Sequence, residues 1–517
     1  MSTIFQPVAK WLDGTAMYRV VTLALISLSV YSIILGFLGK LSYTGTEQLI
    51  SLVVALAVAL LVNYIYSRLF KAHVNMESAV ITALIVFFLI IPAQISNLSD
   101  SWVIAVVVML AISSKFLISW RKQHLLNPAA AGGGGFALAD WLFSIPGYFE
   151  STWWIGRPEL FLPLLIVGGA VVYKVRKWTP VISFLLVAFA VFLFEEARFY
   201  DYAWSNSYLT SFWLSGPSLF LAFFMLTEPF TLPPTKKLQG VYGAVVGFIS
   251  QTTLFLSLGI KMTPELALVI GNLLFFPTTL RQKLFLKLES VREIAKHTYE
   301  FVFEKPSGLV FLPGQYLEWM LPHVGSDNRG IRRYFTVASA PEENKIRLGV
   351  RFGDTISSFK KALRAMKAGD EIIASQRAGD FLLPKETSTK LAFIAGGIGI
   401  TPFISQIESM AKGVRKYNTV LYYCNNNEEE IAYFDYLKSA SAILPLKVVH
   451  VLAKEEKPGF ETGFVTAQMI KKFTPDYLER TWYLSGPPGM VNAYSTLLVG
   501  LCVPRRQIVK DFFPGLA

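Results

Sequence analysis

Long apolar segments fill the first 283 residues of this 517-residue chain, and they constrain its fold more than any other feature of the sequence. A helix needs roughly 20 apolar residues to cross the hydrocarbon core of a bilayer. Segments of about this length recur here, separated by short loops in which Lys and Arg collect. Because hydrocarbon offers no hydrogen-bond partners to the backbone, spanning segments fold as helices. The sequence therefore predicts a polytopic α-helical membrane domain.

We predict about ten spans in this region. The first apolar run ends without a cleavage site, so we expect a retained span rather than a signal peptide. The fifth span contains four consecutive glycines and Asp140, which predicts a broken helix. The third and eighth spans are weakly similar in sequence and lie five spans apart, which suggests two five-span repeats. Because five is an odd number, the repeats would be inverted, with a site at their interface. The predicted spans are residues 17–39, 46–67, 77–97, 101–119, 127–145, 158–174, 178–196, 209–228, 239–260 and 263–281.

Basic residues mark alternate connections between the spans, as at Arg121 and Lys122. The positive-inside rule assigns such loops to the cytoplasm. Ten spans then place both termini there, so we expect a multi-pass protein of the cell membrane with a cytoplasmic C-terminal half. These loops also explain the net charge of +12. No basic-aromatic nucleic-acid motif is evident, so we expect a lipid bilayer as partner and no nucleic acid.

Cysteine and histidine usage limits the cofactors. Cys424 and Cys502 are the only cysteines, whereas an iron–sulfur cluster typically takes four. We expect two buried thiols in a reducing compartment. The membrane half has only His73 and His124, and a bis-histidine haem stack across the bilayer needs pairs at two depths. We therefore expect no metal site and assign both histidines to loops or span ends.

The stretch RRYFTVAS, residues 332–339, lies in the polar part of the chain and has the residue types that a flavin requires. Arg333 suits the pyrophosphate, Phe335 or Tyr334 offers an apolar wall for the ring, and Thr336 offers a hydrogen bond near N5. Strand alternation places Arg333, Phe335 and Val337 on one face. An ordinary amphipathic strand explains the same pattern. Ser339 closes the stretch and joins the candidates.

Two further motifs predict phosphate sites. Ser357 and Ser358 fall at a predicted helix start, where free N–H groups and the helix dipole favour a phosphate, although simple capping is the alternative. In KLAFIAGGIGITPF, residues 390–403, an apolar strand runs into a glycine turn and then a helix. Its glycines allow close approach of a pyrophosphate, and Thr401 is expected to cap the helix.

The end of the following strand bears on the choice of nucleotide. Asn425, Asn426 and Asn427 precede three glutamates, Glu428 to Glu430. Acidic residues repel a 2′-phosphate and suit a ribose hydroxyl. This run favours NADH over NADPH as the electron donor.

Residues from about 285 onward resemble the ferredoxin–NADP reductase superfamily, an FAD-binding β-barrel followed by a nucleotide-binding α/β domain. The resemblance implies that Thr336 and Ser485 act at the reacting centre; many relatives have Cys where this chain has Ser485. It also implies a C-terminal aromatic shield for the flavin, from Phe512 or Phe513. The implied FAD contacts are Arg333, Tyr334, Phe335, Thr336, Ser339, Ser357 and Ser358. The implied nucleotide site is Gly396, Gly397, Gly399, Thr401, Gly486, Pro487 and Met490.

Roughly residues 15–283 resemble the family shared by the B subunit of sodium-pumping NADH:quinone reductase and the D subunit of the Rnf complex. The matching pieces are NMESAVITAL, LLNPAAAG, GPSLFLAFFMLTEP and PELALVIGNLL. The family implies a ten-span protein that holds flavin. Its SGAT-like loop for covalent FMN is absent between Asn127 and Arg157, so we expect non-covalent FMN or riboflavin. Candidate contacts, which equally suit helix–helix hydrogen bonding, are Asn75, Ser78, Thr82, Lys115, Asn127, Thr227 and Glu228.

The sequence thus predicts three domains: a transmembrane electron-transfer domain (1–283), an FAD-binding β-barrel (284–387) and an NAD(P)H-binding α/β domain (388–517). The predicted function is transfer of electrons from cytosolic NAD(P)H through FAD into or across the membrane. The acceptor is a membrane flavin, a quinone or an extracytoplasmic electron-carrier protein. The alternatives are an ion-coupled redox pump and a transporter or channel regulated by a reductase domain.

Overall fold

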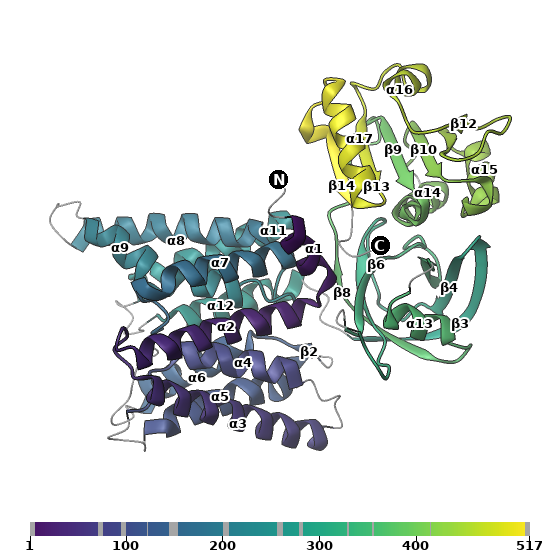
Figure 1. Cartoon of the computed structure of the whole chain (residues 1–517). Helices are drawn as coiled ribbons and strands as arrows, with labels where there is room; N and C mark the ends of the chain where they lie inside the picture. Colours follow the sequence, from purple (N-terminus) through teal and green to yellow (C-terminus); the bar gives the residue numbers. More distant parts are fainter. Residues whose placement is uncertain are drawn as a thin grey trace. The chain divides into compact units, whose positions relative to one another are not determined.

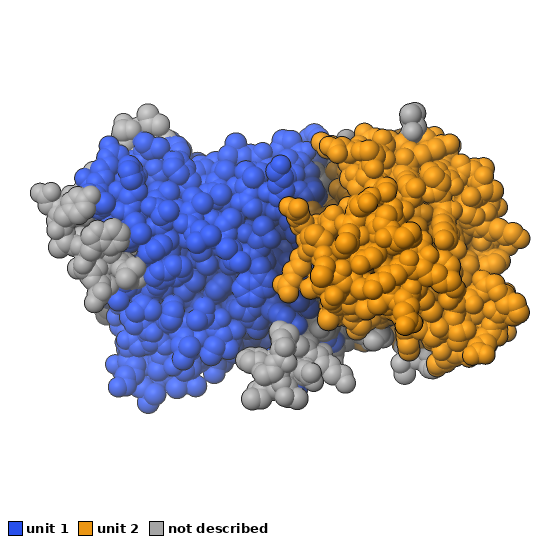
Figure 2. Space-filling view, turned by 90° about the horizontal axis from the view of Figure 1, so that it is seen from above, with its two compact units in different colours: residues 1–283 blue, residues 284–517 orange. Residues whose placement is uncertain are grey.

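The computed structural model describes residues 6–70, 76–94, 100–120, 123–143, 153–199, 206–255, 262–278, 283–327, 330–353, 356–413 and 415–511. The chain divides into two compact units, residues 1–283 and 284–517. They are blue and orange in Figure 2. The division falls at the first predicted domain boundary, and the second boundary, near residue 387, stays a prediction.

The first unit is built from helices, which Figure 1 shows packed side by side. A two-stranded hairpin, β1 (Ser119–Trp120) and β2 (Gln123–His124), follows the fifth of them. The helices are α1 (Gln6–Gly14), α2 (Met17–Phe37), α3 (Gly45–Leu69), α4 (Met76–Leu89), α5 (Ser101–Leu117), α6 (Pro128–Phe143), α7 (Pro158–Val175), α8 (Trp178–Phe199), α9 (Asn206–Leu214), α10 (Ser218–Phe220), the π-helix η3 (Leu221–Met225), α11 (Lys236–Gln251), α12 (Pro264–Phe275) and the 3₁₀ turn η5 (Phe276–Thr278).

Among the described residues, four helices are long and apolar enough to cross a membrane: α2, α3, α7 and residues Trp178–Arg198 of α8. Shorter apolar helices lie at Met76–Leu89, Ser101–Leu117 and Pro264–Thr278. Large apolar side chains such as Leu61, Ile166 and Leu186 are exposed on the long helices. Such an apolar exterior fits a lipid environment. The count of about ten spans and the inverted repeats remain predictions.

The predicted break in the fifth span is wrong, because α6 runs unbroken through its four glycines. The glycines serve close packing instead. A Cβ on Gly132 would stand 2.6 Å from the carbonyl oxygen of Val107 in α5, and one on Gly133 would stand 3.0 Å from Cγ of Glu265 in α12. Small residues allow membrane helices to approach this closely. The irregularity lies instead in the eighth predicted span, where α10 passes into the π-helix η3.

The second unit begins with a six-stranded antiparallel sheet, in the order β6-β5-β8-β3-β4-β7. Figure 1 shows this sheet curled, with helix α13 (Ser358–Ala365) beside it. Alternating apolar residues give β3 one buried face. Trp319 of β5 and Phe303 of β4 pack against each other in the core of this sheet. The strands are β3 (Leu284–Ala295), β4 (Thr298–Glu304), β5 (Tyr316–Met320), β6 (Arg332–Thr336), β7 (Lys345–Arg351) and β8 (Glu371–Ala378).

A parallel sheet follows, in the order β12-β11-β10-β9-β13-β14. Its central strand β9 is buried on both faces, as parallel strands covered by helices usually are. The strands are β9 (Leu391–Gly396), β10 (Thr419–Asn425), β11 (Leu446–Leu452), β12 (Glu461–Thr462), β13 (Thr481–Ser485) and β14 (Ile508–Asp511). The helices are α14 (Thr401–Lys412), α15 (Phe434–Ile443), α16 (Ala467–Phe473) and α17 (Pro488–Gly500), with 3₁₀ turns η6 (Gly397–Ile400), η7 (Glu428–Glu430) and η8 (Arg505–Gln507).

The strand order reverses at β9. The chain adds β10, β11 and β12 on one side of β9, and then β13 and β14 on the other. Ligands of such sheets bind in the crevice at the carboxyl ends of the strands where the order reverses. Here that crevice lies at the ends of β9 and β13, where both predicted glycine turns occur.

Candidate functional site

The two glycine turns at the ends of β9 and β13 touch each other. A Cβ on Gly399 would stand 2.6 Å from the carbonyl oxygen of Ser485 and 2.7 Å from the backbone N of Gly486. A Cβ on Gly396 would collide with Met490 of α17 and lie 3.2 Å from Cδ of Pro487. The structure therefore brings together these predicted nucleotide-site residues, and glycine is required at position 399 because backbone packs on backbone there.

Helix α14 starts at the first turn, but its start differs from the prediction. Thr401 is the first helical residue, and its hydroxyl donates to the carbonyl oxygen of Ile398 at 3.2 Å. Thr401 therefore does not cap the helix, because a capping hydroxyl must accept from the backbone N–H groups. Gly397 takes a left-handed φ of +52°, which favours glycine. The N-terminus of α14 and its dipole thus lie at this turn.

Strand β6 carries the predicted flavin residues with the expected alternation. The guanidinium carbon of Arg333 lies 5.3 Å from the ring centroid of Phe359 in α13, and the Phe335 ring lies 6.0 Å from the same ring. Tyr334 is on the other face, where its hydroxyl donates to Glu318 at 3.0 Å. The predicted pairing of Arg333 with Phe335 on one face is confirmed.

The remaining candidates of this stretch differ in accessibility. Phe335 is buried, whereas Tyr334 is partly exposed and packs edge-to-face on Tyr316 at 5.6 Å. Thr336 is buried at the end of β6. Ser339 is fully buried and joins the two sheets: its hydroxyl accepts from the Arg347 N–H at 3.2 Å, and its carbonyl oxygen accepts from the Ser405 hydroxyl at 2.7 Å. Tyr334 is thus the more accessible aromatic candidate.

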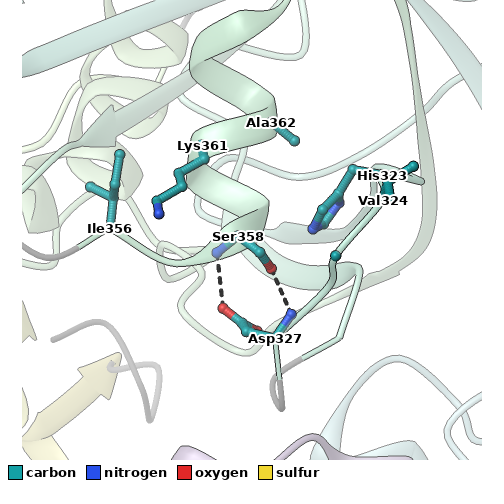
Figure 3. A pocket seen from close by; sticks show the side chains of 8 residues that line it. His323, Val324, Asp327, Ile356, Ser358, Lys361 and Ala362 are labelled. Carbon is teal, nitrogen blue, oxygen red and sulfur yellow. Dashed lines mark hydrogen bonds between the residues drawn. The ribbon is translucent and has the colours of Figure 1, made fainter.

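The start of α13 already holds an anion. Ser357 is the N-cap, and its hydroxyl accepts from the Lys360 N–H at 3.3 Å. The Ser358 N–H donates to the Asp327 carboxylate at 2.9 Å, and the Asp327 N–H donates back to the Ser358 hydroxyl at 2.9 Å (Figure 3). The other carboxylate oxygen of Asp327 lies 3.5 Å from Arg333. A carboxylate therefore occupies the position predicted for a phosphate.

A pocket of about 580 Å³ opens beside this helix start. Figure 3 shows that residues from two segments line it. The lining includes His323, Asp327, Ser358 and Lys361. One wall thus offers cationic and N–H groups next to the predicted phosphate position.

A buried ion network links the two sheets of the second unit. Arg347 of β7 pairs with Glu408 of α14 and lies 3.4 Å from Glu300 of β4. Glu408 also accepts from the Ala340 N–H at 3.0 Å. The side chains of Glu300 and Glu408 are 0% and 7% exposed. Removing one member of such a network leaves a buried charge, so the network holds α14 against the antiparallel sheet.

The three glutamates after β10 are each paired with a cation. Glu428 pairs with Lys457, Glu429 lies 2.7 Å from Lys296, and Glu430 lies 2.7 Å from Arg351. The sequence argument treated them as unpaired acids that repel a 2′-phosphate. Because their charges are largely balanced, the structure weakens that argument for NADH.

In the helical unit, predicted residues meet around the end of η3. The Asn127 amide donates to the carbonyl oxygen of Met225 at 3.1 Å, and the Thr227 hydroxyl donates to that of Phe223 at 2.7 Å. His124, which the sequence placed at a loop or span end, lies on β2 with its Nε2 2.9 Å from Glu228. This irregular segment therefore gathers polar groups, as π-helical segments at functional sites often do.

A second contact joins Lys115 to the start of α4. Its ammonium donates to the carbonyl oxygen of Ser78 at 2.9 Å and to the Ser78 hydroxyl at 3.1 Å. Thr82 donates to the same carbonyl oxygen at 2.9 Å. These bonds are also what helix packing requires. Asn75, His73, Phe512 and Phe513 lie outside the described residues.

Sequence reasoning missed two residues of these sites, Asp327 and Arg351, and it did not predict the contact between His124 and the candidate Glu228. Asp327 lies six residues before Arg333, and its position ahead of a flavin strand was the available signal. Arg351 ends an apolar-alternating strand and had no local signal.

Comparison with known proteins finds a family match in each of the two units. Residues 157–275 match the NQR2, RnfD, RnfE family, and residues 393–496 match the oxidoreductase NAD-binding domain. Part of the first unit is therefore similar to the NQR2, RnfD, RnfE family, and part of the second unit is similar to the NAD-binding domain of oxidoreductases. Both resemblances predicted from the sequence are confirmed in these regions.

Relatives match the C-terminal part. A flavohemoprotein of Xylella fastidiosa is 26% identical over 208 residues, 39% of this chain and 50% of that protein. The toluate 1,2-dioxygenase electron transfer component of Pseudomonas putida is 29% identical over 213 residues, 40% of this chain and 61% of that protein. The chain spans about half the length of the curated relatives it matches.

The solved structures that match part of the chain include the cytochrome P450 reductase GcoB of Amycolatopsis. Its TM-score is 0.41 at 23% identity, covering 45% of this chain and 70% of that chain. A ferredoxin NADP+ reductase of Neisseria gonorrhoeae with bound FAD and NADP has a TM-score of 0.39 at 19% identity, covering 44% and 98%.

Proposed function

We propose that this chain is a membrane-bound, NAD(P)H-dependent flavoprotein reductase. It takes electrons from cytosolic NAD(P)H through FAD and passes them into or across the bilayer. The observation that carries the proposal is the touching pair of glycine turns at the crevice of an oxidoreductase NAD-binding domain. This crevice belongs to a chain whose other half is an NQR2/RnfD-type membrane domain.

The groups around β6 and α13 fit an FAD. When bound, FAD accepts a hydride from the nicotinamide and releases electrons one at a time. Arg333 and the Ser358 N–H would hold a phosphate of FAD once it displaces the Asp327 carboxylate that they contact here. Ser357 orders the helix start. Tyr334 or Phe335 flanks the ring, and Thr336 hydrogen-bonds near N5.

The nicotinamide nucleotide is assigned to the crevice of the parallel sheet. Gly396, Gly397 and Gly399 admit its pyrophosphate close to the backbone. Ser485, with Gly486, Pro487 and Met490, borders the nicotinamide. We retain NADH as the donor, with NADPH as the alternative, because the amides of Asn425 to Asn427 suit a ribose hydroxyl.

The membrane half is proposed to receive the electrons. In this proposal the membrane half has about ten spans in two inverted repeats, and its positively charged loops, which the positive-inside rule assigns to the cytoplasm, support a cytoplasmic reductase unit. A non-covalent FMN or riboflavin binds near Lys115, Asn127, Thr227 and Glu228. Asn75, which directly precedes α4 in the sequence, is a further candidate contact. The terminal acceptor is a quinone or an extracytoplasmic electron-carrier protein.

Flavin stoichiometry tests both halves. The full chain is purified in detergent and denatured, and the released flavins are identified and counted per chain. FAD plus a second flavin supports a membrane domain that carries electrons. FAD alone refutes the membrane flavin and favours a quinone that diffuses to the reductase unit. A preparation without FAD that cannot be reconstituted refutes the proposal.

Two variants locate the flavins. Arg333→Ala should release most of the FAD, because it removes the cation at the phosphate position, and it should leave the second flavin bound. Lys115→Met should release the second flavin and leave the FAD bound. Unchanged FAD content in Arg333→Ala contradicts the assignment of this arginine.

A second candidate, an ion-coupled redox pump, is favoured by the His124–Glu228 contact. Ionisable groups within a membrane domain are rare and mark ion or proton pathways. Purified protein in liposomes, supplied with NADH and a quinone, is assayed for sodium and proton uptake. Uptake that Glu228→Gln abolishes supports a pump, and electron transfer without uptake excludes it.

A further inference from the structure

Asp327, in the segment between β5 and β6, contacts both groups that we assign to the flavin phosphate. Its carboxylate accepts from the Ser358 N–H at 2.9 Å, and its N–H donates to the Ser358 hydroxyl at 2.9 Å (Figure 3). Its second carboxylate oxygen lies 3.5 Å from Arg333. Guanidinium and N–H groups bind carboxylates and phosphates alike. Asp327 and a phosphate therefore compete for the same donors.

Other contacts hold Arg333 in its position. Its Nη1 donates to the carbonyl oxygen of Gly330 at 2.9 Å and to that of Arg332 at 2.6 Å. Its guanidinium carbon lies 5.3 Å from the ring centroid of Phe359. The side chain of Arg333 is 17% exposed, whereas that of Asp327 is 32% exposed. Removal of the Asp327 carboxylate therefore leaves a fixed cation at this position.

The start of α13 has its own cap. Ser357 is the N-cap residue, and its hydroxyl accepts from the Lys360 N–H at 3.3 Å. The first N–H groups of a helix have no partner within the helix, and such a cap satisfies one of them. The Ser358 N–H is another of these groups, and the helix dipole favours an anion beside it. The helix start can therefore exchange the Asp327 carboxylate for a phosphate and keep its cap.

The segment that carries Asp327 is exposed and loosely packed. Val324 is fully exposed, and Gly325 has a left-handed φ of +70°. Apart from the chain neighbours, a Cβ on Gly325 would meet no described atom within 4 Å. Figure 3 shows that this segment forms one wall of the pocket of about 580 Å³, opposite Lys361 of α13. Segments with few contacts open at low free energy, so the carboxylate can leave the helix start.

We propose that Asp327 is a built-in competitor of the flavin phosphate, and that FAD binds by exchanging its phosphate for this carboxylate. The inference rests on the proposed function, because it requires FAD at β6 and α13. FAD binds only to chains in which the carboxylate has left, so the apparent Kd for FAD rises as that fraction falls. Asp327 thus weakens FAD binding and makes the FAD occupancy of the chain follow the FAD concentration.

The test uses the full chain in detergent, freed of its flavins, and measures the Kd for FAD by quenching of FAD fluorescence. Asp327→Ala should lower this Kd about 5- to 20-fold, because FAD then breaks no partly exposed hydrogen bond to a charged group. Asp327→Asn should give an intermediate Kd, because a neutral acceptor binds the Ser358 N–H less strongly. Inorganic pyrophosphate should compete with FAD, and Asp327→Ala should lower its inhibition constant by the same factor.

Asp370→Ala is the matched control. Asp370 follows the other end of α13, and its carboxylate accepts from the Lys367 N–H at 2.7 Å. The variant therefore also removes a carboxylate from a backbone N–H, but away from the predicted phosphate position. Its Kd for FAD should equal that of the wild type. An equal fall of the Kd in Asp370→Ala would refute the inference, because the loss of any nearby negative charge would then be responsible.

The direction of the change in Kd separates the alternatives. A higher Kd for FAD and a lower melting temperature in Asp327→Ala would make Asp327 a structural cap of α13 and overturn the inference. An unchanged Kd, or a fall for FAD without a fall for pyrophosphate, also overturns it and leaves the proposed function intact when Arg333→Ala loses FAD. Asp327→Asn, which keeps the shape of the side chain, decides if Asp327→Ala does not fold. A wild-type chain that binds no FAD overturns the proposed function and this inference with it.

Discussion

Replacing Gly399 by alanine tests the nucleotide crevice where its two turns touch. The added Cβ would stand 2.6 Å from the carbonyl oxygen of Ser485 and 2.7 Å from both Cα and N of Gly486. Non-bonded heavy atoms attract best at about 3.5–4.0 Å, so the turns must separate by about 0.5–1 Å. All three neighbours are backbone atoms, which cannot rotate away as a side chain does.

We expect this overpacking to cost about 1–3 kcal/mol of stability. That loss lowers the melting temperature of the C-terminal unit by about 2–4 °C for each kcal/mol. Catalysis should suffer more, because a displacement of about 1 Å can cost about 100-fold in rate. With ferricyanide as acceptor, kcat/KM for NADH should fall about 10- to 100-fold. FAD content should stay at the wild-type level, because the proposed flavin residues lie on β6 and α13.

Gly500→Ala provides the control. Gly500 ends α17, and a Cβ there meets no atom within 4 Å. Its melting temperature and kcat/KM should match the wild type. Wild-type kcat/KM in Gly399→Ala would refute the reasoning that contact between the two turns shapes the nucleotide site. Loss of FAD in Gly399→Ala would refute the separation of the two cofactor sites.

Three further outcomes follow from the second unit. Burial raises the pKa of Cys424 to about 12, whereas Cys502 is exposed, so the expectation of two buried thiols is wrong for Cys502. Iodoacetamide should therefore label one thiol per native chain and two after denaturation, as counted by mass spectrometry. Burial lowers the pKa of His450 from 6.5 to about 4. The unfolded chain therefore binds the proton first, and the free energy of unfolding falls by up to about 3 kcal/mol as the pH drops from 6.5 to 4. The melting temperature of His450→Leu should depend less on pH than that of the wild type, and an unchanged pH dependence would contradict this. Arg347→Met should cost about 3–5 kcal/mol, because it leaves Glu408 buried without its cation; a denaturant midpoint equal to that of the wild type would show that the pair is not needed.

Local sequence patterns predicted which segments form helices and which form strands. Apolar runs of about 20 residues predict helices whatever they pack against, because lipid leaves no other way to satisfy the backbone. The order strand, glycine turn, helix around Gly396 predicted the parallel sheet, because this order is typical of a strand–helix–strand nucleotide-binding unit. Alternation along β6 placed Arg333 and Phe335 on one face, since successive side chains of a strand point to opposite sides.

The failures share a cause. The four glycines of α6 locally predict a break, but the helix continues through them, and at Gly132 the backbone of α5 lies so close that a Cβ would stand 2.6 Å from the Val107 carbonyl oxygen. Thr401 has the residue type of a cap, yet its hydroxyl bonds the carbonyl oxygen of Ile398 in the preceding turn. In both cases the local preference of the residue is overridden by neighbours that the sequence does not place.

What the sequence determined by itself is the division into an apolar helical half and a flavin- and nucleotide-type half, together with most candidate residues. These properties depend on short-range order, in which residue type and spacing suffice. Only the tertiary structure decided how charges pair. It balanced the glutamates after β10 with cations from distant segments, filled the start of α13 with the Asp327 carboxylate, and brought Arg351 to the Gly397 turn. Electrostatic partners are set by distance in space, and chain order alone does not give that distance.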